Sequence, residues 1–423
     1  MILLIRILIL NLIFISKISA QFLPSTVGVH HKKNTASNSD ESFVLDFNNG
    51  NTCTSNCSNS FYGEIDWSTN TMTTYTISMW VKSGESNPVK FRAFFNTHTS
   101  HSDGLQLDSN GSYKYRLHSK AGTVNFGDNT IKTTWVHLAV VAETDGSNSK
   151  TTRLYYNGSL ATGSPVNWVE STWSEIEIGR NRNENRPGNY YLDEVRVWKA
   201  ALTADNINAW MHKPIDNSHP NYSDLNVYFQ MNSNSISGST LLDISGKNNH
   251  AQLYQHSDIN TTTSYVPVVD LNSSYQTDVE AIWSATGDYH NESDASDGLS
   301  MSLVSPASAL AEANLVIYGN NGTQSSSSTS ILGLSKISDR VWQFDETGTV
   351  SANVKIDIGT ATGYSGGATL TADNYKLLYK TCTMCDYSIL AQGSSISNSD
   401  NITFSSVAIK DGFYSIASED DNL

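Results

Sequence analysis

Charged residues are scarce in this chain, and basic residues are the scarcest of them. Of 423 residues 16% are charged, with 26 Lys and Arg against 41 Asp and Glu, which gives a formal net charge of −15. Nucleic acids and anionic membrane surfaces both require a basic surface on their partner, so the composition argues against both. An acidic surface favours solubility and can also attract divalent cations.

Long apolar runs are missing after the first 20 residues, which read MILLIRILILNLIFISKISA. Arg6 supplies positive charge, an apolar core runs from Ile7 to Ile15, and Ile18-Ser19-Ala20 offers a cleavage site. The apolar run is shorter than a membrane-spanning helix of about 20 residues. We therefore expect a signal peptide over 1–20, a secreted protein, and no membrane insertion of the mature chain. Lys17 is unusual so near the cut, so an uncleaved anchor is the alternative.

Cysteine is rare, with four residues in two close pairs, Cys53 with Cys57 and Cys382 with Cys385. In a secreted protein two local disulfides are the natural pairing. A zinc site would require four ligands, and a redox pair at Cys382 and Cys385 would favour a βαβ context. The surrounding sequence supplies neither, so we predict two disulfides that close short loops.

Ser, Thr, Asn and Gly are abundant instead, and tyrosine reaches 20 residues. This composition is typical of extracellular β-structure with many turns. Apolar and polar residues alternate in short runs, the first of which places Phe43, Leu45 and Phe47 on one face. The length allows two or three domains. We therefore predict an all-β protein with more than one domain.

The stretch from Ile176 to Trp210 has the most distinctive pattern in the chain. It contains, in order, Ile178-Gly179-Arg180, the run LDEVRVW at 192–198, and Ala201-Leu202-Thr203. This order resembles the closing hairpin and helix start of a laminin-G-like domain, which has the concanavalin A-like jelly-roll fold. Three earlier segments resemble strands of the same family in the same order: TISMWVK at 76–82, WVHLA at 135–139 and LYYNG at 154–158.

The resemblance divides the chain into regions. It implies a polar linker over 21–42 and a laminin-G-like jelly roll over 43–213. Residues 214–267 resemble an element that flanks such domains in secreted bacterial proteins, and we interpret them as a connecting segment. Short alternating runs with Gly, Ser and Asn turns predict a second, Ig-like β-sandwich over 268–423. Parts of it, such as 340–344, resemble a module of Bacteroidota-type surface proteins.

The jelly-roll family includes laminarinase-type glycoside hydrolases, whose acids follow an E-x-D-x-x-E or E-x-D-x-E pattern on one strand face. Glu64-Ile65-Asp66 supplies two of these acids, but Ser and Thr follow where the third belongs. Glu175-Ile176-Glu177 also lacks a third acid. The sequence therefore holds no complete catalytic motif, and we predict no catalytic residue. His137, between apolar strand residues, fits a structural role better than a catalytic one.

The resemblance also implies a bound calcium ion near the first and last strands of the domain. Asp46 and Asp193 are the positions that match, and the Asn48-Asn49-Gly50-Asn51 turn offers further oxygens. Calcium takes six to eight oxygen ligands. The alternative is that Asp193 forms a hydrogen bond with the backbone of the closing strand.

A carbohydrate site requires aromatic faces for sugar rings beside polar groups for the hydroxyls. Trp168 and Trp173 lie in a polar stretch that leads to Arg180, and we interpret these three residues as a binding rim. The alternative is that both rings pack under the edge of the sandwich.

These observations predict a secreted, non-catalytic, lectin-like protein that binds polysaccharide or glycoprotein at the cell surface, assisted by calcium. The alternatives are a structural spacer or adhesin subunit that binds only protein, and a laminarinase-like glycoside hydrolase. The sequence predicts no oligomeric state.

Overall fold

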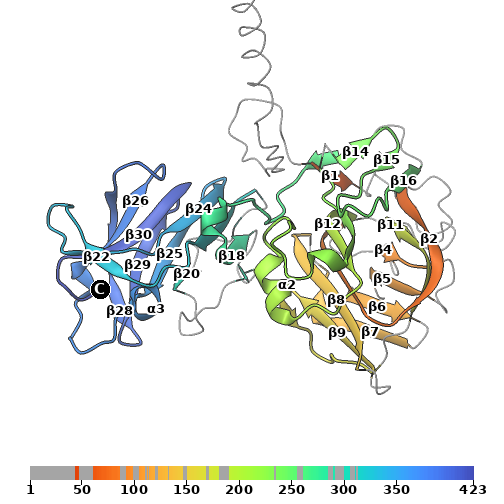
Figure 1. Ribbon diagram of the computed structural model, residues 1–423, viewed down its shortest axis with the longest axis horizontal. Coiled ribbons are helices and arrows are strands. Elements are labelled where there is room, and N and C mark those ends of the chain that lie inside the picture. Colours follow the sequence, from red (N-terminus) through yellow and green to blue (C-terminus); the bar gives the residue numbers. More distant parts are fainter. Residues whose placement is uncertain are drawn as a thin grey trace, which may run out of the picture. The chain divides into compact units, whose positions relative to one another are not determined.

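The computed structural model describes residues 43–46, 61–85, 92–98, 104–109, 112, 114–119, 122–131, 133–145, 150–167, 171–180, 190–232, 235–254, 261–283, 289–290, 300–304, 310 and 313–423. The predicted signal peptide and linker, Cys53, Cys57, Trp168 and the Asn48–Asn51 turn lie outside the described residues. Within the described part, strands dominate, and the α-helices are α2 (Ala204–Trp210) and α3 (Ile358–Thr362). The all-β prediction is confirmed (Figure 1).

Two antiparallel sheets build the first sandwich. The strand order of the first sheet is β10-β9-β8-β3-β12-β1-β17, and β13 also pairs with β12. The strand order of the second sheet is β14-β15-β16-β2-β11-β4-β5-β6-β7. The first, called sheet A, contains β1 (Phe43–Asp46), β3 (Tyr75–Ser83), β8 (Val136–Thr144), β9 (Lys150–Tyr156), β10 (Ser159–Leu160), β12 (Tyr190–Trp198), β13 (Leu225–Phe229) and β17 (Thr261–Thr263). The second, called sheet B, contains β2 (Tyr62–Met72), β4 (Ala93–Asn96), β5 (Leu105–Ser109), β6 (Lys114–Ser119), β7 (Gly122–Thr130), β11 (Ser171–Ile178), β14 (Ile236–Ser237), β15 (Thr240–Leu241) and β16 (Ala251–Tyr254).

The segment 214–267, interpreted from sequence as a connection, supplies strands to both sheets. Its alternating apolar residues explain why, because Val227, Phe229 and Leu253 are buried in the same hydrophobic core as the preceding strands. Burial of a side chain of this size contributes roughly 1.5–3 kcal/mol. The first sandwich therefore extends to Thr263, and the predicted boundary at 213 is corrected.

The closing strand β12 contains a β-bulge at Glu194, whose backbone φ is 51°. The extra residue shifts the alternation of the strand by one position. Leu192, Val195 and Val197 therefore all reach the core, although strict alternation would place Leu192 on the opposite face from the two valines. Arg196 is left on the outer face of sheet A.

Two further sheets share a separate hydrophobic core and form the second sandwich, as predicted. Sheet C contains β18 (Thr277–Trp283), β19 (Tyr289–His290), β21 (Leu315–Asn320), β22 (Ser326–Ser328), β23 (Lys336–Ser338), β24 (Trp342–Thr347), β26 (Tyr375–Lys380), β27 (Ser388–Gln392) and β30 (Gly412–Ser418). Sheet D contains β20 (Met301–Val304), β25 (Ser351–Asp357), β28 (Ser395–Ser397) and β29 (Asn401–Ala408).

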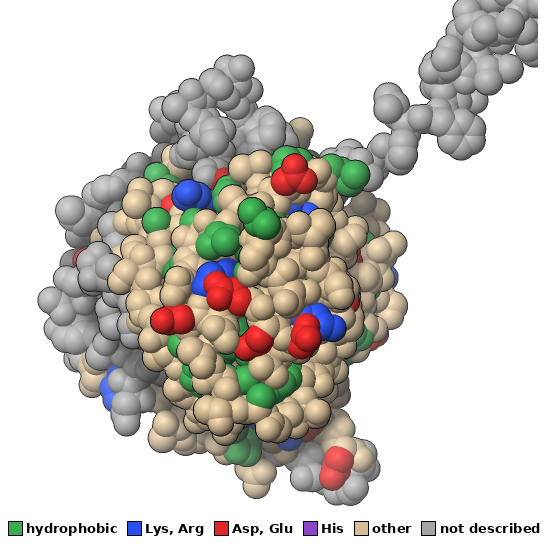
Figure 2. Space-filling view, turned by 90° about the vertical axis from the view of Figure 1, so that its left-hand side faces the viewer, with side chains coloured by type: hydrophobic (Ala, Val, Ile, Leu, Met, Phe, Trp, Pro, Cys, Tyr) green, Lys and Arg blue, Asp and Glu red, His purple; other side chains and the backbone are tan. Residues whose placement is uncertain are grey.

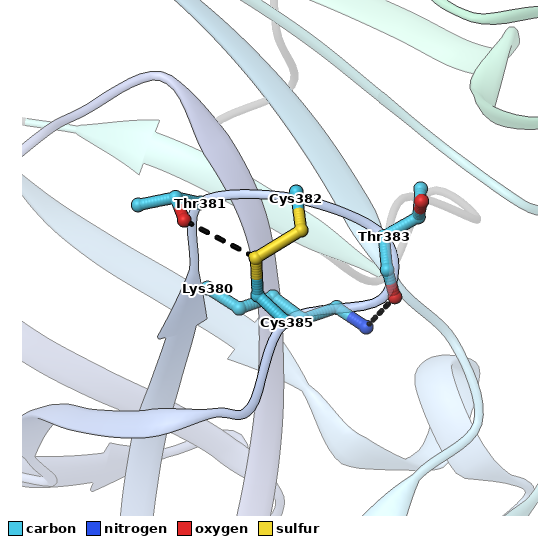
Figure 3. The surroundings of a disulfide bond; sticks show 5 residues. All are labelled: Lys380, Thr381, Cys382, Thr383 and Cys385. Atoms are coloured by element: carbon cyan, nitrogen blue, oxygen red, sulfur yellow. Dashed lines mark hydrogen bonds between the residues drawn. A yellow bond between two sulfur atoms is a disulfide. The ribbon is translucent and has the colours of Figure 1, made fainter.

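A disulfide joins Cys382 to Cys385 in the turn between β26 and β27, as predicted (Figure 3). The two sulfurs are 2.05 Å apart and the two Cα atoms 5.1 Å apart. Lys380 Nζ donates a hydrogen bond to Thr383 O at 2.7 Å, across the same turn. Because Thr381 to Met384 are exposed, the disulfide fixes a surface turn and contributes nothing to the core.

The surface on the side of the second sandwich shows acidic and basic side chains scattered among uncharged ones (Figure 2). No basic patch of the kind that binds nucleic acid is visible on this face. The described residues include no helix that is both long and apolar enough to cross a membrane.

Candidate functional site

The two acid pairs that lie far apart in the sequence meet on one face of sheet B. β2 and β11 are antiparallel neighbours, and their register places Glu64 opposite Glu177 and Asp66 opposite Glu175. The isoleucine at the centre of each pair is buried in the core. Since successive residues of a strand point to opposite faces, the four acids share the outer face of the sheet. Below, this group of four is called the acidic face.

Polar residues extend the acidic face in both directions. A single row of cross-strand partners runs through seven strands, from β16 to β7. Its members are Gln252, Glu64, Glu177, Asn96, Gln106, His118 and Thr123. Every position in this row is polar, whereas the opposite face of the same strands forms the hydrophobic core. Glu177, Asn96 and Gln106 in the middle of the row are buried, so a ligand can reach the row at its ends, at Gln252 with Glu64 and at His118 with Thr123.

The four acids differ in their exposure to solvent. Asp66 is exposed, Glu64 and Glu175 are half-buried, and Glu177 is only 3% exposed. Like charges directly opposite each other in a sheet destabilise it. The repulsion between these acids therefore requires a compensating positive charge.

Arg180 supplies that compensation. Its Nε donates to Glu177 Oε1 at 2.5 Å, and the two side chains are 11% and 4% exposed. Its guanidinium also lies over the ring of Tyr62, with Cζ 3.1 Å from the ring centroid. Tyr62 in turn stacks on Tyr254, with ring centroids 4.8 Å apart and an interplanar angle of 13°. Arg180, predicted at a binding rim, thus lies beside the acidic face but is buried and already ion-paired.

Asn96 in β4 lies opposite Glu177 and connects two of the acids. Its Nδ2 is 3.2 Å from Glu175 Oε1 and 3.5 Å from Glu177 Oε2, and it also donates to His98 O at 2.8 Å. Its Oδ1 is buried and has no hydrogen-bond partner. A buried acceptor without a donor costs about 1–3 kcal/mol. The acidic face is therefore rich in acceptors and short of donors.

The pKa values of the two β11 acids are strongly raised. Burial, followed by the charge of Glu64, raises the pKa of Glu175 to about 7, and Arg180 opposes the shift. Burial likewise raises the pKa of Glu177 to about 7, against the opposing charge and hydrogen bond of Arg180. Carboxyl groups that titrate near neutral pH can both donate and accept hydrogen bonds there.

Beyond Asn96 the polar face contains an ion-paired group on β5 and β6. Arg116 forms an ion pair with Asp108, with Nη2 2.5 Å from Oδ2 and Nε 2.7 Å from Oδ1. Gln106 donates to the same carboxylate. Arg116 and Gln106 thus supply donors to the carboxylate of Asp108 in this part of the face.

Trp173 does not lie at a surface rim, and that prediction is corrected. Its side chain is fully buried in the core, with its ring 5.3 Å from that of Tyr75 and 5.9 Å from that of Trp67. The reason is a register irregularity between Trp173 and Glu175, which shifts the alternation of β11. Trp173 therefore faces the core with Ile176 instead of sharing the acidic face. The alternative reading, that the ring packs inside the sandwich, is correct for this residue.

The backbone register places the predicted calcium positions close together. Asp46 pairs with Tyr191, two residues before Asp193 in β12. The side chain of Asp46 lies outside what the structure describes. Asp193 is buried, its Oδ1 accepts from the backbone N–H of Glu194 at 2.8 Å, and its Oδ2 accepts from Ser264 Oγ at 2.9 Å.

Asp193 thus forms the backbone hydrogen bond expected under the structural alternative. Over the described ranges, no three His, Cys, Asp or Glu side chains gather as metal ligands. Calcium stays a prediction.

The rest of the LDEVRVW run is structural. Arg196 is buried and contacts Glu194 Oε2 at 2.5 Å, Trp210 O at 2.9 Å and Lys213 O at 2.6 Å. Tyr228 Oη donates to the same Glu194 oxygen at 2.6 Å. These bonds hold β12 to the segment after α2 and to the neighbouring strand β13. Glu194 and Arg196 therefore stabilise the conformation of the domain.

His137 has the structural role that we expected. It is 2% exposed, and its ring lies 5.3 Å from that of Trp80. Its backbone N–H donates to Asn157 Oδ1 at 2.8 Å.

The first sandwich is similar in sequence to a known protein family. Residues 58–208 match the family model of the concanavalin A-like lectin/glucanases superfamily. The first sandwich is a concanavalin A-like domain. The match confirms the resemblance predicted from the LDEVRVW run and the earlier strands. No curated protein matches the chain at a significant level.

Several solved structures are similar to part of this chain. A proposed carbohydrate binding protein from Bacteroides ovatus is 15% identical, over 55% of this chain and 62% of that one, with a TM-score of 0.41. An SAP-like pentraxin from Limulus polyphemus is 12% identical, over 40% and 82%, with a TM-score of 0.31. Domain 4 of an extracellular arabinanase from Geobacillus stearothermophilus, solved with arabinotriose, is 19% identical, over 33% and 65%, with a TM-score of 0.23. The chain spans less than two thirds of the first and third of these proteins.

Proposed function

We propose that the protein is a secreted lectin-like protein that binds carbohydrate, without cleaving it, on the acidic face of its concanavalin A-like domain. One observation carries the proposal: the row of polar cross-strand partners that crosses sheet B from Gln252 to Thr123. Carboxylates and amides bind sugar hydroxyls, and aromatic rings stack on sugar faces. Tyr254, which is exposed and stacks on the buried Tyr62, supplies such a ring beside the acids.

Secretion is supported by the Cys382–Cys385 disulfide as well as by the apolar N-terminal sequence. Disulfides persist mainly in oxidising compartments outside the cytosol. The partner that we propose is a polysaccharide or a surface glycoprotein.

Affinity electrophoresis of the mature chain against a panel of polysaccharides tests the proposal. We expect at least one polysaccharide to retard the protein, and Asp66→Asn to weaken the retardation. Asp66 is exposed, so the substitution leaves the core intact. Asp205→Asn is the matched control, because Asp205 is an exposed acid on α2, away from sheet B. If every polysaccharide fails to retard the wild-type chain, the spacer or protein-binding alternative replaces this proposal.

The same gels run with calcium and then with EDTA address the predicted ion at Asp46 and Asp193. Retardation that EDTA abolishes supports a calcium-assisted lectin. Retardation that persists in EDTA removes calcium from the proposal and leaves carbohydrate binding intact.

Glycoside hydrolysis is a second candidate, favoured by the raised pKa values of Glu175 and Glu177. A general acid must still hold its proton at the working pH, and a pKa of about 7 allows this. A reducing-sugar assay on each retained polysaccharide tests it. Activity that Glu175→Gln or Glu177→Gln abolishes would establish the hydrolase.

A further inference from the structure

The acidic face carries an unbalanced charge. Four carboxylates, those of Glu64, Asp66, Glu175 and Glu177, share it. The only basic side chain that the structure describes beside them is Arg180, which is already committed to Glu177 and to the ring of Tyr62. Within the described part of the chain, no Lys, Arg or His pairs with Glu64 or Asp66.

Hydrogen-bond donors are few among the described residues of the acidic face. The amide nitrogen of Asn96 is shared among His98 O, Glu175 and Glu177. The Oδ1 of the same amide is buried and, within the described part of the chain, has no hydrogen-bond partner, whereas Glu64 and Asp66 offer acceptors that a ligand can reach. A ligand that brings several donors and positive charge complements these acceptors, whereas a carboxylated or sulfated ligand adds further acceptors and negative charge.

An aromatic platform borders the acids on the β16 side. Tyr254 is partly exposed and stacks on Tyr62, next to the acids of β2. Aromatic faces attract cations as well as the C–H faces of sugar rings. The platform and the acids thus favour a ligand that combines a sugar ring with a cationic group.

We propose that the acidic face selects a glycan that carries protonated amines, of the glucosamine-oligomer class, over neutral and acidic glycans. This inference rests on the proposed function, because it names the ligand class of the same site. The ammonium groups lie against Glu64 and Asp66, and a sugar ring lies on Tyr254.

Isothermal titration with three oligosaccharides of equal length, at pH 6.5 and low salt, tests the inference on the mature chain. The probes are a glucosamine oligomer, its fully N-acetylated counterpart and an oligogalacturonate. We expect the glucosamine oligomer to bind about tenfold more tightly than the N-acetylated one, and oligogalacturonate to show no heat of binding. A double variant, Glu64→Gln with Asp66→Asn, should bring the preference to within about threefold.

Non-specific attraction to a chain of net charge −15 requires its own control. Asp205→Asn combined with Asp373→Asn removes two exposed acids elsewhere, one on α2 and one near β26, and should leave the preference unchanged. An equal loss of preference in this control and in the Glu64/Asp66 variant would overturn the inference. Equal affinity for the glucosamine and N-acetylated oligomers would also overturn it while leaving carbohydrate binding in place. Absence of binding to every glycan, here and in the polysaccharide panel, would instead overturn the proposed function itself.

Discussion

Glu64 and Glu177 face each other across neighbouring antiparallel strands, with 112 residues between them in the sequence. Two like charges in this position repel each other, and the described contacts of Arg180 and Asn96 with this pair are made with Glu177. The pair is therefore electrostatically unfavourable for the fold, and Arg180 offsets part of this cost at Glu177.

Arg180→Gln should destabilise the fold strongly, because it leaves Glu177 buried without its ion-pair partner. The loss of one partner of a buried ion pair costs about 3–5 kcal/mol. Urea unfolding followed by tryptophan fluorescence measures the change. Arg153→Gln is the matched control, since its ion pair with Glu143 is about one third exposed and worth roughly 0–1 kcal/mol. Glu177→Gln in the Arg180→Gln background should restore part of the stability; if it does not, the buried charge is not the cause.

The stability of the first sandwich should fall as pH rises from about 5 to about 7. The folded pKa values of Glu175 and Glu177 are raised to about 7, above their unfolded values, so the folded state binds more protons in this interval. The stabilisation from this protonation is complete below the unfolded pKa and is lost as pH passes the folded pKa. Urea midpoints measured at half-unit steps check the slope, which should flatten in a Glu175→Gln, Glu177→Gln variant. A slope unchanged by both substitutions would contradict the prediction.

Tyr254→Ala should weaken glycan binding about tenfold and lower the free energy of unfolding by at most about 1.5 kcal/mol, the value of its stacking contact with Tyr62. The ring is 39% exposed and packs only against Tyr62 among the described aromatic contacts, so its loss affects the platform more than the core. Loss of an aromatic stacking partner costs about 0.5–1.5 kcal/mol. Titration with any glycan that retards the wild-type chain gives the measurement. Leu160→Ala, an exposed apolar residue in β10, is the control and should bind like the wild type.

Trp173→Ala should destabilise the first sandwich by about 3–5 kcal/mol, as expected for an aromatic residue removed from a packed core. Trp173→Phe keeps most of the packing and should retain wild-type glycan affinity. The two measurements are urea unfolding and glycan titration. A large loss of affinity in the stable Trp173→Phe variant would return this residue to the binding site.

The Cys382→Ser, Cys385→Ser variant should lose at most about 2 kcal/mol, because a loop this short removes little entropy from the unfolded chain. The turn is exposed, so no core contact is lost with the bond. Unfolding of the variant should match that of the wild type measured in excess dithiothreitol. A larger loss in the variant alone would point to a packing role for the sulfurs.

Local sequence patterns predicted the architecture well, because alternation, turns and the LDEVRVW run report directly on strands and their closure. The acidic face was missed for the opposite reason: each acid pair is incomplete alone, and only the pairing of β2 with β11 unites them. The available signal was the repeated acid-isoleucine-acid pattern at 64–66 and 175–177. Trp173 was predicted at the surface, but a register irregularity in β11 turns its side chain toward the core. Such irregularities leave little trace in a single sequence. The role of 214–267 was missed because its strands are short and far from their partners.

The position of β1 has a consequence for how the chain acquires its structure. This strand, at the start of the folded region, lies between β12 and β17, whose pairing residues come about 145 and 215 positions later. The first sandwich therefore cannot close while the ribosome or an export channel still holds Thr263. Contacts so distant in sequence make folding slow. Until β17 is available, the strands that precede it remain without a complete set of partners and are prone to aggregate.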